Sequence, residues 1–453
     1  MKIIIAGAGD IGMELALRLS QENHEVVILE KDREKISEIA NKIDAMVVED
    51  TGEHITALLN AGVKDADVFI SVTNSDELNM MFCLIAKNLS DIKTVARVRN
   101  PEYSNSKNVF SNRHLGIDIM IDPERMTAFE IAKLIRTPEA TEVEYFAEGK
   151  IELFALRVEK DSELTGTLVS QLPRSPDYLI ISILREDGKA IIPRGDDVIY
   201  PNDIIYVIKK ASAFIEIGSM ARNEKKRFKS VMILGGGKVG SNLAKILESN
   251  RKNGLSVKIV ENSAQRCELL SDQLSRTLVL NGDAADINFL QQEDIQHIDV
   301  VVSVTGRDEL NILTSLLAKK LGVSKTITEI NRVDYESILQ TLEIDSYVSS
   351  RLLVAGKLSK LFRKSNIISE TILKDGKAEM VELIVPPNAR FINQPLKELR
   401  LSAKGLIVGG ILRAGKAIIP RGDDYLAPND RLIIFTTSQN VQLLDKFFGD
   451  KTA

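Results

Sequence analysis

Two glycine-rich loops in the chain have the spacing that binds a phosphate. They read Gly7-Ala8-Gly9-Asp10-Ile11-Gly12 and Gly235-Gly236-Gly237-Lys238-Val239-Gly240. The first glycine of such a loop permits a tight turn, the second lets a phosphate approach the backbone, and the third lets a helix pack closely on a strand. The amides and the dipole at the helix start then attract a pyrophosphate without a charged side chain. We predict that both loops bind a nucleotide; the alternative is that the glycines serve packing alone.

The loops belong to a tandem repeat. The seven residues IIPRGDD begin at Ile191 and again at Ile418, and the segment Ser71–Asn79 returns with small changes as Ser303–Asn311. Repeats this far apart are copies of a whole folding unit, because solenoid repeats have periods of about 20 to 50 residues. We call the two halves the first copy and the second copy.

An acidic residue follows each loop where a ribose would bind. Glu30 ends the apolar segment after the first loop, and Glu261 ends the matching segment after the second. A carboxylate there accepts hydrogen bonds from the ribose hydroxyls and repels a 2′-phosphate. The pattern predicts that both sites reject NADP and admit NAD(H), ADP or ATP, and it does not choose among these ligands.

Polar residues near the ends of later strands are further candidates for the site. Asp50 and Asp283 follow the third predicted strand of each copy, on the adenine side. Thr73 and Asn74 stand where the fourth strand meets a helix, and the spacing from Asn74 to Glu77 is that of a capping box. Asn74 is therefore either a nucleotide ligand or only a helix cap.

The copies differ at the end of the fifth predicted strand. The first copy has Arg97 and Arg99 there, and the second has Glu329 and Asn331. Arginines at this edge of a parallel sheet are placed to pair with phosphates. We therefore predict that the first copy is the stronger phosphate site.

The phosphate loops differ in the opposite sense. The first loop carries Asp10 and the second carries Lys238 at the same place. A unit charge about 8 Å away contributes roughly 2 kcal/mol at an effective dielectric constant of about 20. This contribution is comparable to that of one arginine, and it works against the predicted ranking.

Strands and helices alternate in the first part of each copy. Apolar segments of strand length are separated by segments with helical spacing, which predicts a Rossmann-like, doubly wound parallel sheet. The predicted strands of the first copy are Lys2 to Ala6, Glu25 to Glu30, Ala45 to Val48, Val68 to Val72 and Thr94 to Val98, and the first helices are Ile11 to Ser20 and Arg33 to Ala40.

A small β-rich α+β domain is predicted to follow each sheet. Short alternating segments with turn signals begin after Glu142, and IIPRGDD is a turn between strands. The charged run Asn223–Arg227 is predicted to be a linker. The predicted domains are 1–136 and 229–364 for the nucleotide-binding units, and 140–215 and 370–450 for the small units.

Composition excludes several classes of protein. The chain has 453 residues with 44% hydrophobic and 27% charged residues, and its net charge of −5 argues against nonspecific binding to nucleic acid or an anionic membrane. We find no signal peptide and no apolar run of about 18 residues, so we expect a cytoplasmic protein. The two cysteines, Cys83 and Cys267, fall in predicted helices without metal-site spacing, so we expect no metal.

The sequence offers no residues for catalysis. A dehydrogenase needs a proton donor or a metal beside the nicotinamide, and none is apparent. The four histidines, His24, His54, His114 and His297, are scattered and do not match between the copies. A soluble NAD-dependent oxidoreductase is the alternative, and a redox-sensing DNA-binding repressor lacks a basic recognition helix.

These features together resemble a known family. Two Rossmann units with GxGxxG loops, acidic strand ends, SVTxxDELN segments and small β-rich partners are similar to the tandem form of the domains that regulate the conductance of potassium (RCK domains). The resemblance covers the whole chain, and the order of four domains is its specific part.

The resemblance implies a function without catalysis. It implies a cytoplasmic homotetramer, peripheral to the inner face of the cell membrane, that gates a Trk-type membrane potassium channel subunit in response to bound NAD(H), or ATP or ADP. Carried over by position, Gly7 to Ile11, Glu30, Thr73, Asn74 and Arg97 form the first site, and Gly235 to Val239 with Glu261 form the second.

Overall fold

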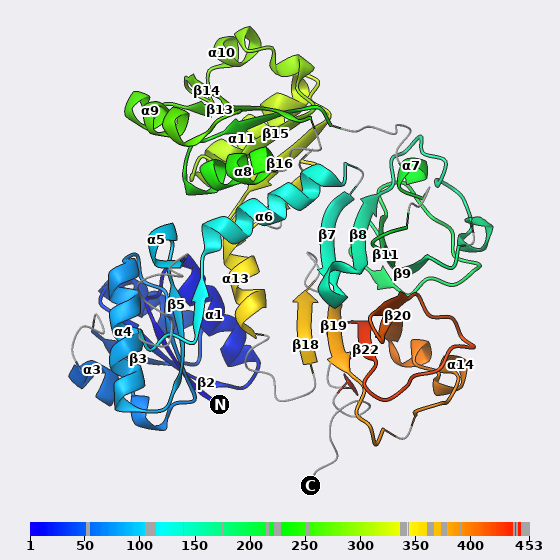
Figure 1. The fold of residues 1–453 in the computed structure, drawn as a ribbon, viewed down its shortest axis with the longest axis horizontal. Coiled ribbons are helices and arrows are strands. Elements are labelled where there is room, and N and C mark those ends of the chain that lie inside the picture. Colours follow the sequence, from blue (N-terminus) through cyan, green and yellow to red (C-terminus); the bar gives the residue numbers. More distant parts are fainter. Residues whose placement is uncertain are drawn as a thin grey trace. The chain divides into compact units, whose positions relative to one another are not determined.

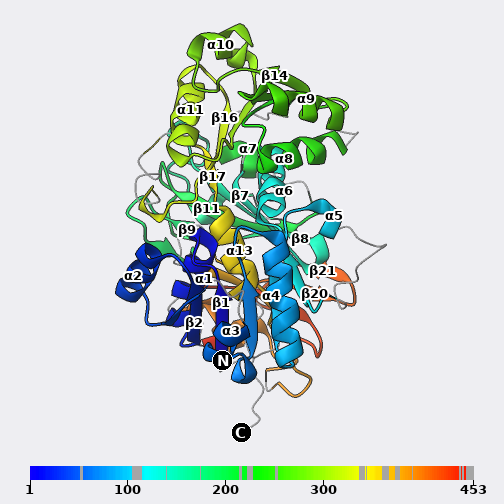
Figure 2. The ribbon, with the colours of Figure 1, turned by 90° about the vertical axis from the view of Figure 1, so that its left-hand side faces the viewer.

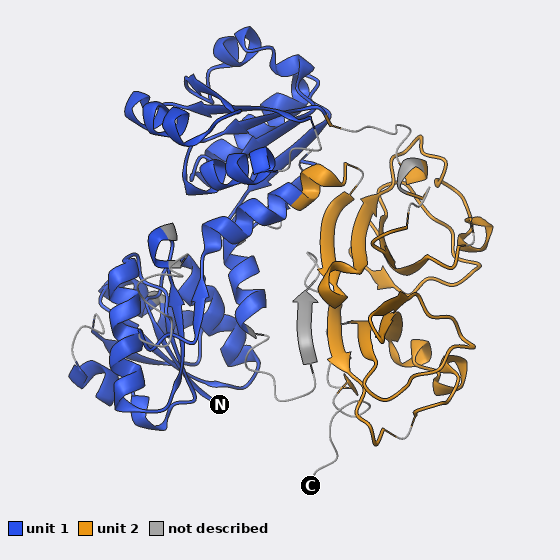
Figure 3. Cartoon of the chain, in the orientation of Figure 1, with its two compact units in different colours: residues 1–132, 229–362 blue, residues 133–228, 363–453 orange. Residues whose placement is uncertain are grey.

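The computed structural model has two compact units, each built from parts of both copies (Figure 3). One unit comprises residues 1–132 and 229–362, and the other comprises 133–228 and 363–453. The structure describes residues 1–50, 55–104, 115–138, 140–173, 175–213, 217–221, 228–249, 254–335, 342, 344–359, 367–372, 378–389, 391–437, 440 and 443–444. The predicted linker Asn223–Arg227 and the residues His54 and His114 lie outside these ranges.

The first unit contains a six-stranded parallel sheet from the first copy (Figure 1). Its order is β3-β2-β1-β4-β5-β6, where the strands are β1 (Lys2–Ala6), β2 (Glu25–Glu30), β3 (Met46–Glu49), β4 (Val68–Ser71), β5 (Lys93–Arg97) and β6 (Ile119–Ile121). The helices are α1 (Asp10–Gln21), α2 (Arg33–Lys42), α3 (Ile55–Asn60), α4 (Asp76–Leu89), α5 (Pro101–Ser104) and α6 (Pro123–Arg136). The predicted sheet is confirmed, and three of the five predicted strands differ from the observed ones by one residue at one or both ends.

The second copy repeats this sheet in the same unit. Its order is β14-β13-β12-β15-β16-β17, where the strands are β12 (Ser230–Leu234), β13 (Ser256–Glu261), β14 (Leu278–Asn281), β15 (Val300–Ser303), β16 (Lys325–Glu329) and β17 (Ser346–Val348). The helices are α8 (Lys238–Ser249), α9 (Ala264–Gln273), α10 (Ile287–Gln292), α11 (Asp308–Lys320) and α13 (Ser350–Ser359). Cys83 and Cys267 lie in α4 and α9, as predicted.

The strand order reverses at the first strand of each sheet. In the first copy, Ile4 of β1 pairs with Val27 of β2 on one side and with Phe69 of β4 on the other. The connections leave β1 in opposite directions, so a crevice opens at the carboxyl ends of the strands. Both glycine loops lie at such a crevice.

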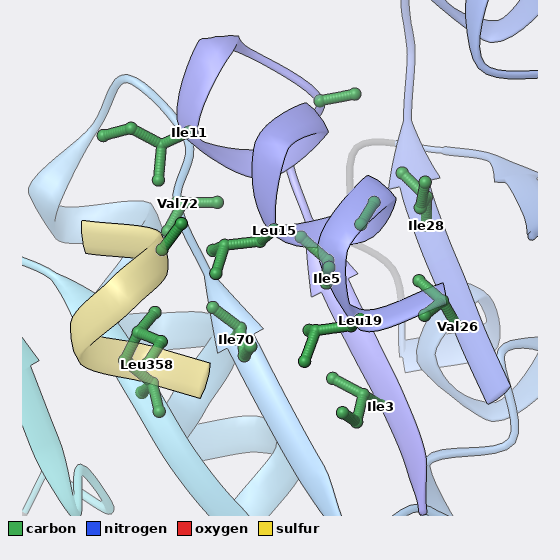
Figure 4. Packing of buried hydrophobic residues seen from close by; sticks show 14 of the residues in the cluster. Ile3, Ile5, Ile11, Leu15, Leu19, Val26, Ile28, Ile70, Val72 and Leu358 are labelled. Carbon is green, nitrogen blue, oxygen red and sulfur yellow. The ribbon is translucent and has the colours of Figure 1, made fainter. Parts of the chain in front are cut away.

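A helix of the second copy completes the core of the first. Val354, Ala355 and Leu358 of α13 are buried in one cluster with Leu15 and Leu19 of α1. Figure 4 shows Leu358 beside the strands of the first sheet, below Leu15. The apolar side chains at these positions share one helix face, because residues three and four apart in a helix are neighbours.

An ion pair and a second helix strengthen the connection between the copies. Arg351 in the first turn of α13 pairs with Glu14 of α1, and both side chains are largely buried. Figures 1 and 2 both place the part of α6 up to Ala132 beside α8 of the second copy. The copies thus exchange helices, and the core of the first sheet is completed by a helix of the second copy.

The second unit holds two five-stranded antiparallel sheets. The first sheet, β10-β9-β11-β8-β7, contains β7 (Ala140–Phe146), β8 (Ile151–Arg157), β9 (Tyr178–Leu184), β10 (Ala190–Ile191) and β11 (Ile204–Lys210). The second, β18-β19-β22-β20-β21, contains β18 (Ile367–Ile372), β19 (Ala378–Ile384), β20 (Leu406–Arg413), β21 (Lys416–Ile418) and β22 (Arg431–Thr437). The short helices α7 (Ile217–Ala221) and α14 (Leu396–Leu399) accompany them.

The two small sheets share a hydrophobic core within their unit. Phe146 and Leu153 of the first copy lie in one buried cluster with Met380 and Phe435 of the second. The Ala147 amide also donates to a Glu382 carboxylate oxygen at 2.9 Å. Each IIPRGDD segment leads from a short strand into the turn before the next strand, as predicted.

Candidate functional site

A cavity of about 860 Å³ lies between the two parallel sheets of the first unit. Its volume falls in the range of about 300 to 1,000 Å³ that is typical of small-molecule sites. The predicted site residues that line it are Gly7, Gly9, Asp10, Ile11, Glu30, Asp50, Thr73, Asn74, Arg97, Gly237, Lys238 and Val239. The predicted residues outside its lining are Ala8, Gly12, Gly235, Gly236, Gly240 and Glu261.

The first loop has the geometry of a phosphate cradle. Gly7 has a φ of +98°, which favours glycine, and its amide donates to the Leu29 carbonyl at 2.9 Å. Gly9 is the N-cap of α1 and has open space where a Cβ would stand. No side chain caps this helix start, so its amides face the cavity side without a side-chain partner.

The third glycine of each loop is required by packing. A Cβ on Gly12 would stand 1.9 Å from the Gly7 carbonyl oxygen, and one on Gly240 would stand 2.0 Å from the Gly235 oxygen. Both contacts are with backbone, which no side-chain rotation relieves. The helix–strand packing role expected of this glycine therefore holds in both copies.

The two ribose-binding candidates are held by backbone amides. Glu30 accepts hydrogen bonds from Ala8 N at 2.8 Å, Lys31 N at 2.9 Å and Asp32 N at 3.1 Å. A carboxylate offers about four acceptor positions, so capacity for a ribose hydroxyl remains. These bonds fix the Glu30 carboxylate between the glycine loop and the start of α2.

The second copy differs on its ribose side. Glu261 accepts from Gly236 N at 3.0 Å and from Ser263 N at 2.8 Å, but it does not line the cavity. Arg266 Nε donates to the Gly236 carbonyl at 2.6 Å. The glycine loop of the second copy thus lines the cavity, and Glu261 lies outside it.

Asn79 organises the crevice and was not among the predicted site residues. Its Oδ1 accepts from Thr73 N at 2.9 Å and Thr73 Oγ1 at 2.7 Å, and its Nδ2 donates to the Arg97 carbonyl at 2.9 Å. Asn311 repeats this arrangement with Thr305 and the Glu329 carbonyl. Its recurrence at the end of both SVTxxDELN segments was the available sequence signal.

The structure differs from the sequence pattern at two residues of the first copy. The N-cap of α4 is Ser75, whose hydroxyl accepts from Leu78 N at 3.2 Å, and Asn74 precedes the cap. Arg99 does not line the cavity, and its Nε donates to Asp76 at 3.0 Å. In this structure the Arg99 guanidinium is therefore held by the buried Asp76 carboxylate at the start of α4.

Arg97 lines the cavity but is already engaged. Its Nη2 lies 2.9 Å from Glu124 Oε1, at the start of α6, and both side chains are mostly buried. Its counterpart Glu329 is buried at the end of β16 and also lines the cavity. Burial, with the nearby charges of Asp308 and Glu124, raises the pKa of Glu329 to about 7.

Two negative results apply to the described part of the chain. No group of three or more His, Cys, Asp or Glu side chains is arranged to hold a metal ion. No helix there is long and apolar enough to cross a membrane. His297 is exposed, and His24 is partly buried near Glu22.

Comparison with known proteins gives matches along most of the chain. The TrkA-N domain model matches residues 3–123 and 231–350, and the TrkA-C domain model matches residues 153–219 and 380–449. The Trk system potassium uptake protein TrkA homolog 1 of Methanosarcina mazei is 34% identical over 455 residues, which cover 99% of this chain and 100% of that protein.

Two solved structures share the fold. The crystal structure of the GsuK RCK domain has a TM-score of 0.63 at 19% identity and covers 99% of this chain and 94% of that one. The structure of the GsuK channel bound to NAD has a TM-score of 0.61 at 18% identity and covers 99% of this chain and 78% of that one.

Proposed function

The chain belongs to the TrkA family of Trk system potassium uptake proteins, and from that premise we propose that it is a regulatory subunit that binds an adenine nucleotide and thereby gates a membrane potassium channel subunit. Relatives at this level of identity carry the name of a potassium uptake protein. The ligand acts by binding one conformation of the assembly better than another, since a ligand shifts an equilibrium only by its differential affinity. No chemical step is needed.

The cavity shared by the two copies is the observation that carries this proposal. It is lined on the first copy by the phosphate loop, the ribose acid Glu30 and Asp50, and on the second by Gly237, Lys238 and Val239. A nucleotide with its adenosine on the Glu30 side would direct its phosphates toward Lys238. Any movement of the second loop relative to the first would then change the affinity.

We further propose one nucleotide for each chain. Glu261 lies outside the cavity, so the second loop adds phosphate contacts to the first site without forming a complete site of its own. NAD is the ligand in the GsuK channel structure of the same fold, which supports NAD(H) as the first candidate. Calorimetric titration with NAD, NADH, ADP and ATP tests this, and a stoichiometry of two ligands per chain would contradict it.

Assembly and location follow from the same premise. A homotetramer of these chains on the inner face of the membrane would present a closed ring of repeated units to a symmetric channel. Because each chain carries two copies of the repeated unit, fewer contacts between separate chains are needed to close such a ring.

The ribose acid should control the choice between NAD and NADP. We expect Glu30→Arg to weaken NAD binding and to admit NADP, because the carboxylate that repels a 2′-phosphate is replaced by a cation. Glu261→Arg is the matched control, and it should leave selectivity unchanged because Glu261 does not line the cavity. Competition titrations of both variants decide this, and unchanged selectivity in the Glu30 variant would remove Glu30 from the site.

The cations of the cavity should contribute unequally to phosphate binding. We expect Arg97→Ala to lose roughly 1 to 3 kcal/mol of binding for a multiply phosphorylated nucleotide, as for a charged hydrogen bond, and Lys238→Ala to lose less. Arg97→Ala also leaves the Glu124 carboxylate without its partner. The double variant Arg97→Ala/Glu124→Gln removes that charge, so the binding loss that remains in it comes from the missing arginine contact. In reconstituted membranes, potassium flux should no longer respond to nucleotide in the Arg97 variants. If the Lys238 variant loses the response and the Arg97 variants keep it, the roles of the two residues are exchanged.

A further inference from the structure

Two largely buried carboxylates meet in the part of the cavity where the two copies face each other. Glu124 at the start of α6 and Glu329 at the end of β16 both line it, together with Arg97. Arg97 binds Glu124 Oε1, while Glu124 Oε2 is buried without a hydrogen-bond partner among the described residues. Asp308 in the first turn of α11 adds a third buried carboxylate nearby.

The matching carboxylates of the two copies are neutralised differently. In the first copy, Asp76 receives the Arg99 guanidinium at 3.0 Å as well as backbone amides. In the second copy, the contacts that the structure gives Asp308 are the backbone amides of Asn331 at 2.8 Å and Arg332 at 2.7 Å.

No arginine takes the place of Arg99 in the second copy. The residue at that position is Asn331, and the neighbouring guanidinium of Arg332 binds Glu309 at 3.0 Å and Asp334 at 3.3 Å. The carboxylates around the end of β16, those of Glu329 and Asp308, therefore have no arginine partner at the position that Arg99 holds in the first copy.

Among the described residues, the Glu329 carboxyl group has one hydrogen-bond donor, at a long distance. Asn331 Nδ2 donates to Glu329 Oε1 at 3.3 Å, and Asn331 Oδ1 in turn accepts from Ser350 N and Oγ. Burial opposes the charged form of the Glu329 side chain, as do the charges of Asp308 and Glu124, and these effects raise its pKa to about 7. Lys238, the cation of the second loop, is exposed at the cavity, and its charge acts to lower the pKa of Asp122.

We propose that Glu329 makes nucleotide binding in the shared cavity depend on its own protonation. The cavity accepts nucleotide phosphates while the Glu329 carboxyl group is neutral, and the ionised carboxylate repels them. The inference rests on the proposed function, because it concerns the same ligand in the same cavity. Its consequence is that nucleotide binding takes up a proton from solvent. Potassium uptake regulated through this cavity would then respond to pH as well as to nucleotide.

The direction of the pH effect follows from linkage. A bound anion favours neutral Glu329 further, so nucleotide affinity should fall as pH rises above about 7, by at most tenfold per pH unit. Folding stability follows the same direction. The carboxyl has an ordinary pKa of 4.5 in the unfolded chain and a pKa of about 7 in the folded protein, so its unfavourable contribution to stability grows as pH rises from 4.5 to about 7 and stays constant above that.

Calorimetric titration of the full-length protein with NAD is the central test. NAD has no terminal phosphate monoester, whose second pKa is about 6, so proton uptake near neutral pH belongs to the protein. We expect wild-type affinity to fall roughly tenfold or more between pH 7 and pH 9. Titrations at pH 7.5 in HEPES and in Tris, which differ in heat of ionisation, should show uptake of a fraction of a proton.

Two neutral variants and one control identify the group. Glu329→Gln should bind NAD about as tightly at pH 9 as at pH 7, and Glu329→Met is a second neutral variant should the first fold poorly. Asp10→Asn removes an exposed acid from the same cavity, and it should retain the wild-type dependence on pH. Without nucleotide, Glu329→Gln should raise the thermal midpoint relative to wild type at pH 8 and change it little at pH 4.5.

The outcomes separate this inference from the function on which it rests. Equal pH dependence of NAD binding in wild type and Glu329→Gln, or wild-type binding without proton uptake, would overturn the role of Glu329 and leave nucleotide regulation standing. A protein that binds none of NAD, NADH, ADP and ATP at any pH would overturn both.

Discussion

Gly12→Ala is expected to destabilise the first copy by about 3 kcal/mol or more and to abolish nucleotide binding there. A Cβ at this position would lie 1.9 Å from the Gly7 carbonyl oxygen. Inserting an atom into a well-packed core typically costs about 1 to 3 kcal/mol, and the cost rises when backbone must move. Denaturant unfolding followed by calorimetry with NAD measures both effects.

Gly9→Ala is the matched control for this prediction. Gly9 has a φ of −72°, which alanine adopts readily, and no atom lies within 4 Å of its added Cβ. The variant should therefore fold like the wild type, yet it should bind nucleotide more weakly, because a methyl group would occupy the approach of the pyrophosphate. Unimpaired NAD binding by Gly9→Ala would mean that the phosphates do not contact this loop.

The second loop offers the same comparison. Gly240→Ala should be as disruptive as Gly12→Ala, since its Cβ would stand 2.0 Å from the Gly235 oxygen. Gly237→Ala has its nearest neighbour at 4.0 Å and should fold normally. A binding loss in Gly237→Ala smaller than in Gly9→Ala would support one site that the second copy only completes.

Much of the fold could be predicted because local patterns decide it. Continuous apolar segments such as Lys2–Ala6 are buried strands, and the glycine loop that follows must turn tightly. The position of Glu30 could be predicted for the same reason, since it ends a strand. These features depend on residues close to one another in the chain.

The charges of the site could not be predicted, because their partners come from distant elements. Arg97 has the sequence signal of a phosphate ligand, but Glu124 reaches it from a helix 27 residues further along the chain. Arg99 is likewise bound by Asp76, from the start of α4. Only the packing of α4, β5 and α6 around one crevice shows which cations are already paired.

The exchange of helices was also beyond sequence reasoning. The apolar face of α13 shows that the helix must be buried, but it does not show which sheet will cover it. Its partners, Leu15 and Leu19, lie more than three hundred residues earlier in the chain. A duplicated chain contains two similar sheets, so a local pattern cannot decide between them.

Leu358→Ala should therefore destabilise the first copy, although Leu358 belongs to the second. The side chain is fully buried in the cluster with Leu15 and Leu19. Truncating a buried leucine costs about 2 to 5 kcal/mol. Hydrogen exchange should show the loss of protection in α1, and Leu313→Ala on the exposed face of α11 should show none there. Loss of protection confined to β12–β17 would contradict the exchanged-helix arrangement.

The same variant tests how the copies communicate, because α13 connects the cavity to the first core. Its first residue, Ser350, lines the cavity and binds Asn331, while Leu358 packs against α1, which begins at the first glycine loop. A nucleotide held at that N-terminus stabilises the arrangement by about 2.7 kcal/mol at one hundred times its dissociation constant. Saturating NAD should thus restore much of the α1 protection lost in Leu358→Ala, at the expense of a weaker apparent affinity. Protection that NAD leaves unchanged would show that the helix exchange holds the copies together without carrying the nucleotide signal between them.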